Sequence, residues 1–130
     1  MARNNYYNKG DFYSEWHRAL KNDLGYIDID SVGICLKCKA PLYLAETTFD
    51  VGQAWKATTT TEKLARLANL PSFLIFYKVN ENREVISFRV KQLTPEKDRK
   101  EVLLEPEAWV QAMELLQDRH NLVCKKKDVA

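Results

Sequence analysis

The stretch GYIDIDSVGICLKCKAPLYLAETTFD, residues 25–50, decides how this chain folds. It begins with apolar and acidic residues in alternation, which is the period-two pattern of a β-strand. A CxxC sequence follows, and a continuous apolar run comes after it. We therefore expect neighbouring strands at residues 26–34 and 42–45, with a bulge or bend near residues 31–33, where the alternation changes phase.

Helical patterns lie on both sides of this pair of strands. Asp11 is a good N-cap, and apolar residues recur at helical spacing within residues 12–20. Farther along, Thr59 and Glu62 have the spacing of a capping box at the start of a helix, which Pro71 ends. One helix is therefore expected before the two strands and another after them.

The rest of the chain predicts two more strands and a last helix. Residues 73–79 are aromatic and β-branched and residues 84–91 alternate, with a turn at residues 80–83 between them. Pro106 opens an amphipathic segment that ends near Asn121. The expected order is helix, strand, strand, helix, strand, strand, helix, which predicts an α+β domain with a mixed central sheet flanked by helices.

Length and composition favour one soluble domain. The chain has 130 residues, of which 45% are hydrophobic and 29% charged, and a net charge of +2 gives no global attraction for nucleic acid. The first residues contain no apolar signal core, and no apolar run approaches the roughly 20 residues that cross a bilayer. We expect a cytoplasmic protein with an N-terminal arm (residues 1–10), a single domain (11–124) and a basic tail (125–130).

Acidic residues gather around the first pair of strands. Asp28 and Asp30 are two residues apart, so both point to one face of a regular strand. Glu46 would bring a third carboxylate from the neighbouring strand. Such an oxygen-rich site suits Mg²⁺ or Mn²⁺, which could activate water against a phosphodiester. The alternative is that the two aspartates form the solvated face of an edge strand.

The cysteines indicate a second type of metal site. Cys35 and Cys38 have the spacing at which two thiolates bind one zinc ion from a tight turn. His120 and Cys124 stand four residues apart at the end of the last helix and would complete a Cys3His set. Alternatively, the cysteines are small buried residues and His120 only complements the helix C-terminus. A redox pair is disfavoured because CLKC does not open a helix after a strand.

The order of these elements resembles the core of the PD-(D/E)XK nuclease superfamily, which includes restriction enzymes and Holliday-junction resolvases. The resemblance covers about residues 11–79 and rests on a helix bearing Glu15, a strand bearing Asp30 and a second strand ending in Glu46. It implies a restriction-endonuclease-like core in which Asp30 and Glu46 bind the metal. Glu15 would match the additional helix-borne acid of many members, although a surface glutamate is the simpler interpretation.

The sequence departs from that family at one position. Thr48 stands two residues after Glu46, where the family has the lysine that positions the attacking water and balances charge. The resemblance implies that a cation from the following helix could replace it, and Gln53 and Lys56 stand one helical turn apart there. The alternative is that Lys56 is a solvated lysine.

Two functions remain open at this stage, together with a purely structural protein that has no site. The first is a metal-dependent endonuclease or exonuclease that cleaves DNA with metal-activated water, with a homodimer as a corollary. The second is a catalytically inactive nucleic-acid-binding or assembly protein on the same fold, stabilised by zinc. Small size and the resemblance suggest a phage protein in a bacterial cytoplasm. No membrane partner is expected.

Overall fold

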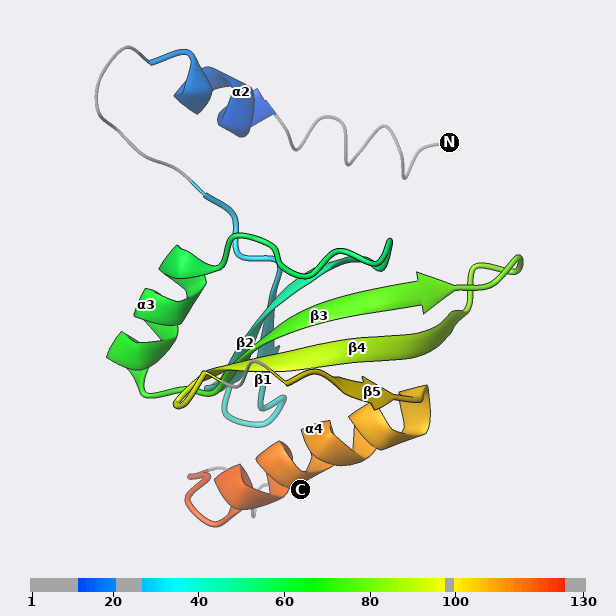
Figure 1. Cartoon of the computed structure of the whole chain (residues 1–130). Coiled ribbons are helices and arrows are strands. Elements are labelled where there is room, and N and C mark those ends of the chain that lie inside the picture. The colour runs from blue at the N-terminus through cyan, green and yellow to red at the C-terminus, as the bar shows by residue number, and fades with distance from the viewer. Residues whose placement is uncertain (1–11, 21–26, 98–99, 126–130) are drawn as a thin grey trace.

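A five-stranded mixed sheet organises the chain, of which the computed structural model describes residues 12–20, 27–97 and 100–125 (Figure 1). The strand order is β1-β2-β3-β4-β5. Strands β2 and β3 are parallel, and all other neighbours are antiparallel. In chain order the elements are α2 (Phe12–Arg18), β1 (Ser31–Ile34), β2 (Pro41–Phe49), α3 (Thr59–Ala68), β3 (Ser72–Val79), β4 (Val85–Thr94), β5 (Val102–Leu104) and α4 (Pro106–Asn121).

Each face of the sheet carries its own apolar cluster. Successive residues of a strand point to opposite faces, so β3 contributes to both clusters. On the face covered by α4, the cluster contains Ala45, Ile75, Val90 and Trp109. On the face covered by α3, it contains Leu74, Phe76 and Leu93. We call these the α4 face and the α3 face.

The α3 face also holds the polar residues of the sheet interior. Glu46 pairs in register with Leu74, so both lie on this face, and Thr61 of α3 packs against Glu46. Arg89 and Lys91 of β4 point to the same side, because they pair with Phe76 and Leu74. The α3 face is therefore the side of the sheet on which charge is buried.

The predicted α+β class with a mixed sheet is confirmed, but the expected order lacks one strand. β5 pairs with β4 from Phe88↔Leu104 to Val90↔Val102. It has three residues, two of them exposed, which is too short for an alternation pattern to register. The final helix was expected from Pro106 to near Asn121, and α4 has these bounds.

The first strand is shorter than predicted, because residues 27–30 precede β1 without strand pairing. Side-chain contacts replace the ladder there. The backbone N–H of Asp30 donates to the Glu46 carboxylate, and the Asp30 carboxylate accepts from the backbone N–H of Thr47. The expected irregularity is present as a register shift between Gly33 and Ile34.

The predicted capping box at Thr59 and Glu62 is wrong. Thr59 is already inside α3, Thr58 is the N-cap, and no side chain caps the helix N-terminus. The Thr58 hydroxyl instead donates to the Glu62 carboxylate over 2.6 Å. Lys97 and Arg66 also contact the Glu62 carboxylate.

The first helix stands apart from the sheet (Figure 1). Among the residues that the structure describes, α2 contacts no strand and no other helix. The N-cap Asp11, the predicted arm at residues 1–10 and residues 126–130 of the predicted tail lie outside the described residues. In the described ranges, no helix combines the length and the apolar character needed to cross a bilayer.

A network of charged side chains around Arg89 of β4 lies on the α3 face. Arg89 is 9% exposed and donates to Asp50 over 2.9 Å and to Glu101 over 2.7 Å. Its guanidinium also lies 4.0 Å from the centroid of the Phe76 ring. The contact ties the loop after β2 to β4, because Arg89 also donates to the Gln53 carbonyl oxygen.

Lowering the pH is expected to weaken this network by protonating Asp50. Hydrogen bonds from Arg89 and from the backbone N–H of Gly52 lower the pKa of Asp50 from 3.8 to about 2. Because the folded-state pKa is depressed, the ionised carboxylate contributes stability above pH 4 that is lost as the pH falls toward 2. Urea unfolding between pH 5 and pH 2 should show a smaller pH dependence for Asp50→Asn than for the wild type. An equal slope in the two proteins would contradict this assignment.

Candidate functional site

The structure brings Asp30 and Glu46 together at the α3 face. Glu46 lies in the middle of β2 and is 5% exposed. Its Oε2 accepts the backbone N–H of Asp30 over 3.1 Å, and its Oε1 accepts the hydroxyl of Thr61 over 3.1 Å. Both hydrogen bonds hold the buried carboxylate in one orientation, so its remaining acceptor sites have a fixed direction.

Lys56 contacts Asp30 and the backbone of the residue that follows Glu46. Its Nζ lies 2.8 Å from Asp30 Oδ2 and also donates to the Thr47 carbonyl oxygen over 3.2 Å. The same Asp30 oxygen accepts the backbone N–H of Thr47 over 2.9 Å. Asp30, Glu46 and Lys56, which stand on a pre-strand segment, a strand and a loop, therefore form one connected group that we call the carboxylate–lysine centre.

Electrostatics keep Asp30 ionised. Partial burial raises the pKa of its carboxyl group, but the hydrogen bonds from Lys56 and from the Thr47 backbone lower it more, so the pKa lies below the model-compound value of 3.8. An ionised carboxylate is the form that binds a metal ion. Asp30 and Lys56 remain about one-third exposed, so solvent and a ligand can reach the pair.

The other predicted members lie outside this centre. The expected helix at Gln53 and Lys56 is wrong, because the chain has no helix between β2 and α3. Gln53 instead closes a turn, with its amide donating to the Phe49 carbonyl and accepting from the Val51 N–H. Thr48, where the resemblance expects a lysine, pairs with Phe76 in the sheet.

Two further acids do not gather with Asp30 and Glu46 in the described part of the chain. Asp28 is exposed in the segment before β1 and joins no group of three potential metal ligands. Glu15 is exposed on α2, which contacts no other helix or strand among the described residues. The carboxylates available for a hard cation at this centre are therefore those of Asp30 and Glu46.

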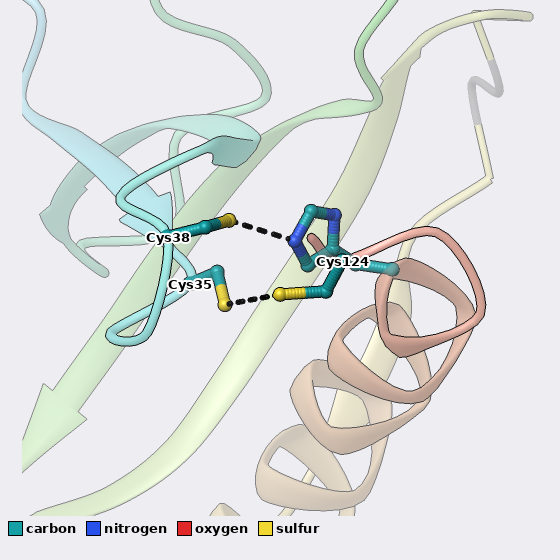
Figure 2. Close-up of side chains that lie close together, drawn as sticks. Cys35, Cys38 and Cys124 are labelled. Carbon is teal, nitrogen blue, oxygen red and sulfur yellow. Dashed lines mark hydrogen bonds between the residues drawn. The ribbon is translucent and has the colours of Figure 1, made fainter. Parts of the chain in front are cut away.

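The four residues of the predicted zinc set meet at one end of the sheet (Figure 2). Cys35 and Cys38 come from the turn between β1 and β2, His120 from the end of α4, and Cys124 from the residues that follow it. Cys35 Sγ lies 3.9 Å from Cys124 Sγ, and Cys38 Sγ lies 3.1 Å from His120 Nε2. All four ligand atoms lie within 4.8 Å of one another.

These distances fit tetrahedral coordination of one ion. With Zn–S bonds of about 2.3 Å and a Zn–N bond of about 2.0 Å, two sulfur ligands lie about 3.8 Å apart and a sulfur–nitrogen pair about 3.5 Å apart. Cys35 and Cys124 are buried, and the other two residues are partly buried. The cluster could therefore hold a metal such as zinc. In the described ranges it is the sole group of three or more histidine, cysteine or acidic residues that gather in this way.

Backbone hydrogen bonds preform the cysteine turn, residues 35–40, which we call the knuckle. The Cys35 N–H donates to the Ala40 carbonyl over 2.9 Å, and the Lys39 N–H donates to the Cys35 carbonyl over 2.7 Å. Lys39 adopts a left-handed conformation with φ 66°, which reverses the chain after Cys38. Lys37 donates to the Asn121 side chain over 3.2 Å and so links the knuckle to the end of α4.

The surroundings of the cluster favour a thiolate at Cys35. The backbone N–H of Cys38 and the amide of Gln117 lower the pKa of Cys35 from 9.0 to about 6. The Ala40 N–H lowers the pKa of Cys38, but burial and the neighbouring sulfurs of Cys124 and Cys35 raise it more, so it lies above 9.0. Thiolates bind metals and thiols do not, so Cys35 is the member already prepared as a ligand.

No protein-family model, curated protein or solved structure matches this chain.

Sequence reasoning missed two contributors to these centres. Thr61 lies in the run of threonines from residue 58 to residue 61 and carries no signal that distinguishes its hydroxyl from the others. Gln117 donates to Cys35 Sγ over 3.4 Å from within α4. It stands three residues before His120, one helical turn away, and this spacing could have marked it as a neighbour of the zinc set.

Proposed function

We propose that the protein is a metal-dependent nuclease that hydrolyses phosphodiester bonds in DNA at the carboxylate–lysine centre. The observation that carries this proposal is the 2.8 Å contact between Lys56 Nζ and Asp30 Oδ2, beside the buried Glu46. The PD-(D/E)XK resemblance requires two acids and one cation in the same place. Here the cation comes from the loop before α3, because Thr48 cannot supply it.

The donor set fits Mg²⁺ or Mn²⁺. Mg²⁺ is usually held by one or two carboxylates and otherwise keeps water molecules and substrate phosphate oxygens. Asp30 and Glu46 supply two carboxylates, and neither is saturated by its hydrogen bonds. A bound divalent ion would supply hydroxide at neutral pH and polarise the phosphoryl group.

The chain's own residues would perform the remaining tasks. Asp30 and Glu46 orient the ion, and the Thr61 hydroxyl and the Asp30 N–H keep Glu46 from rotating. Lys56 places a positive charge beside the reacting phosphate, where charge increases in the transition state. Its contacts with Asp30 and the Thr47 carbonyl orient the ammonium before substrate arrives.

The same proposal assigns a structural zinc ion to the Cys3His cluster. Four protein ligands complete a tetrahedral shell and leave no position for water or substrate, which is the property of a structural zinc site. The ion would join the knuckle to the end of α4.

The proposal is tested by incubating the protein with labelled duplex, single-stranded and branched DNA in Mg²⁺ or Mn²⁺. We expect cleavage that requires the added ion and that falls at least about 100-fold in Asp30→Asn and Glu46→Gln. Asp118→Asn, an exposed acid on α4, is the matched control and should cleave normally. In the control reaction without metal, Mg²⁺ and Mn²⁺ are left out and no chelator is added, because a chelator would also remove zinc from the Cys3His cluster.

The second candidate is a DNA-binding protein without cleavage. The observation that favours it is the ion pair itself, since Asp30 already neutralises Lys56 and the motif position holds Thr48. This candidate predicts that the three DNA substrates bind and remain intact in both ions. Cleavage that both acid substitutions leave unchanged would exclude the proposed centre.

A further inference from the structure

A cavity of about 280 Å³ opens on the α3 face and is lined by Ala54, Trp55, Lys91 and Lys97. Ala54 and Trp55 immediately precede Lys56 in the chain, so the cavity adjoins the loop that carries the proposed catalytic cation. Its size is near the lower end of the range for ligand pockets and suits one compact group of a larger ligand.

The cavity contains a buried positive charge. Lys91 is 8% exposed, and its Nζ donates to the Ala54 carbonyl over 2.7 Å and lies 4.8 Å from the centroid of the Trp55 ring. Among the described residues it forms no ion pair. Buried charges in proteins are usually paired, and an anion in the cavity would supply a counter-charge that the described residues do not.

A second cation completes the lining. Lys97 Nζ lies 4.5 Å from the Trp55 ring centroid and 3.3 Å from Glu62 Oε2. Glu62 is shared, because Arg66 also lies 3.8 Å from its carboxylate. Two cations thus share one acid, no described acid pairs with Lys91, and the described side chains give the cavity a net positive charge.

We propose that this cavity binds a phosphoryl group through Lys91 and Lys97, and that the group is a backbone phosphate of bound DNA. Trp55 holds both ammonium groups against its ring, which limits their conformational freedom before the anion arrives. The inference that the cavity binds a phosphoryl group depends only on the residues that line it. The assignment of that group to DNA rests on the proposed function. The DNA would then contact the protein at two places, the carboxylate–lysine centre and this cavity.

Binding is measured without added divalent ion, so that the result does not depend on cleavage. The indole N–H resonance of Trp55, assigned by its loss in Trp55→Phe, is followed by NMR during titration with inorganic phosphate, a mononucleotide and a short DNA duplex. We expect the resonance to shift with all three ligands and at the lowest concentration with the duplex. A duplex that leaves it unmoved while free phosphate shifts it would overturn the assignment to DNA.

Substitutions then separate phosphate binding from support of the loop. Lys97→Met and Lys91→Met should each weaken duplex binding several-fold and lower the slope of log K against log salt concentration by about 1. Lys63→Met, an exposed lysine of α3, is the control, and Lys91→Arg should retain most of the affinity. The Lys97 side chain is 40% exposed, so its variant remains informative if Lys91→Met does not fold. Unchanged affinity and slope in Lys97→Met, and in Lys91→Met where it folds, would overturn the proposal.

A failure of this inference and a failure of the proposed nuclease give different results. If the chain binds DNA through the cavity but does not cleave it, the duplex still shifts Trp55 and both lysine variants still lose affinity. If the chain cleaves DNA at the carboxylate–lysine centre but the cavity binds no phosphate, the acid variants lose cleavage while Lys91→Met and Lys97→Met bind DNA as the wild type does.

Discussion

Replacing Cys35 or Cys124 by serine is expected to abolish stoichiometric zinc binding and to lower the free energy of unfolding by several kcal/mol. Both sulfurs are buried, and the ion would join the knuckle to the end of α4 across 89 residues of sequence. The residues of α4 in the α4-face cluster, Trp109, Ala112 and Met113, lie in the first half of the helix, so the ion would anchor its other end. We therefore expect the variants to unfold more than about 10 °C below the wild type.

Metal analysis of protein purified under reducing conditions, together with thermal unfolding, measures this effect. The chain has two histidines, which allows a matched comparison: His120→Ala should lose zinc and stability, whereas His17→Ala should keep both. Gln117→Leu should weaken zinc affinity about 10-fold to 100-fold, because it removes the amide that donates to Cys35. Reduced wild-type protein that contains no zinc and unfolds at the same temperature with and without a chelator would exclude the site.

Replacing Lys56 by methionine is expected to lower the rate of DNA cleavage by about 100-fold to 1,000-fold with little loss of stability. Both side chains of the Lys56–Asp30 ion pair are about one-third exposed. Exposed ion pairs contribute only about 0–1 kcal/mol to the free energy of folding. The change therefore removes a preorganised positive charge from the centre and leaves the sheet and α3 in place.

The measurement is single-turnover cleavage at saturating enzyme, with thermal unfolding as the check on folding. Lys56→Arg should recover part of the activity, and Lys63→Met, on the exposed side of α3, should leave it unchanged. If Lys56→Met cleaves at the wild-type rate, Lys56 is a surface residue that happens to pair with Asp30. The proposed centre would then consist of Asp30 and Glu46 without a cation.

The parts of the fold that follow from local pattern could be predicted. The strand at Phe73–Val79, its antiparallel partner and the helix that opens at Pro106 have continuous periodicity, and the structure contains all three elements. β5 could not be predicted, because a three-residue strand is defined by its neighbour β4 rather than by its own pattern. The late start of the first strand, at Ser31, was missed for a related reason, since the Glu46 side chain on β2 accepts the backbone N–H of Asp30.

The two candidate centres differ in what the sequence could supply. The CxxC and the His120–Cys124 pair each have a local spacing, and only their meeting required the structure. Lys56 was a candidate cation for the site on a different basis, because it was assigned to a helix that does not form, and its contact with Asp30 required the structure. A loop can deliver the same ammonium because its position is set by anchors such as Arg89, which holds the Gln53 carbonyl, and Lys91, which holds the Ala54 carbonyl.

The knuckle and the residues after α4 have a consequence for how the chain matures. Cys35 and Cys38 lie before β2, whereas His120 and Cys124 come from the end of α4 and the residues after it, so they leave the ribosome after every strand of the described sheet. A nascent chain can therefore build the sheet and α3 before it can close the metal cluster. A product truncated before His120 would keep its carboxylate–lysine centre but could not complete the metal cluster, and its end would remain open to proteolysis.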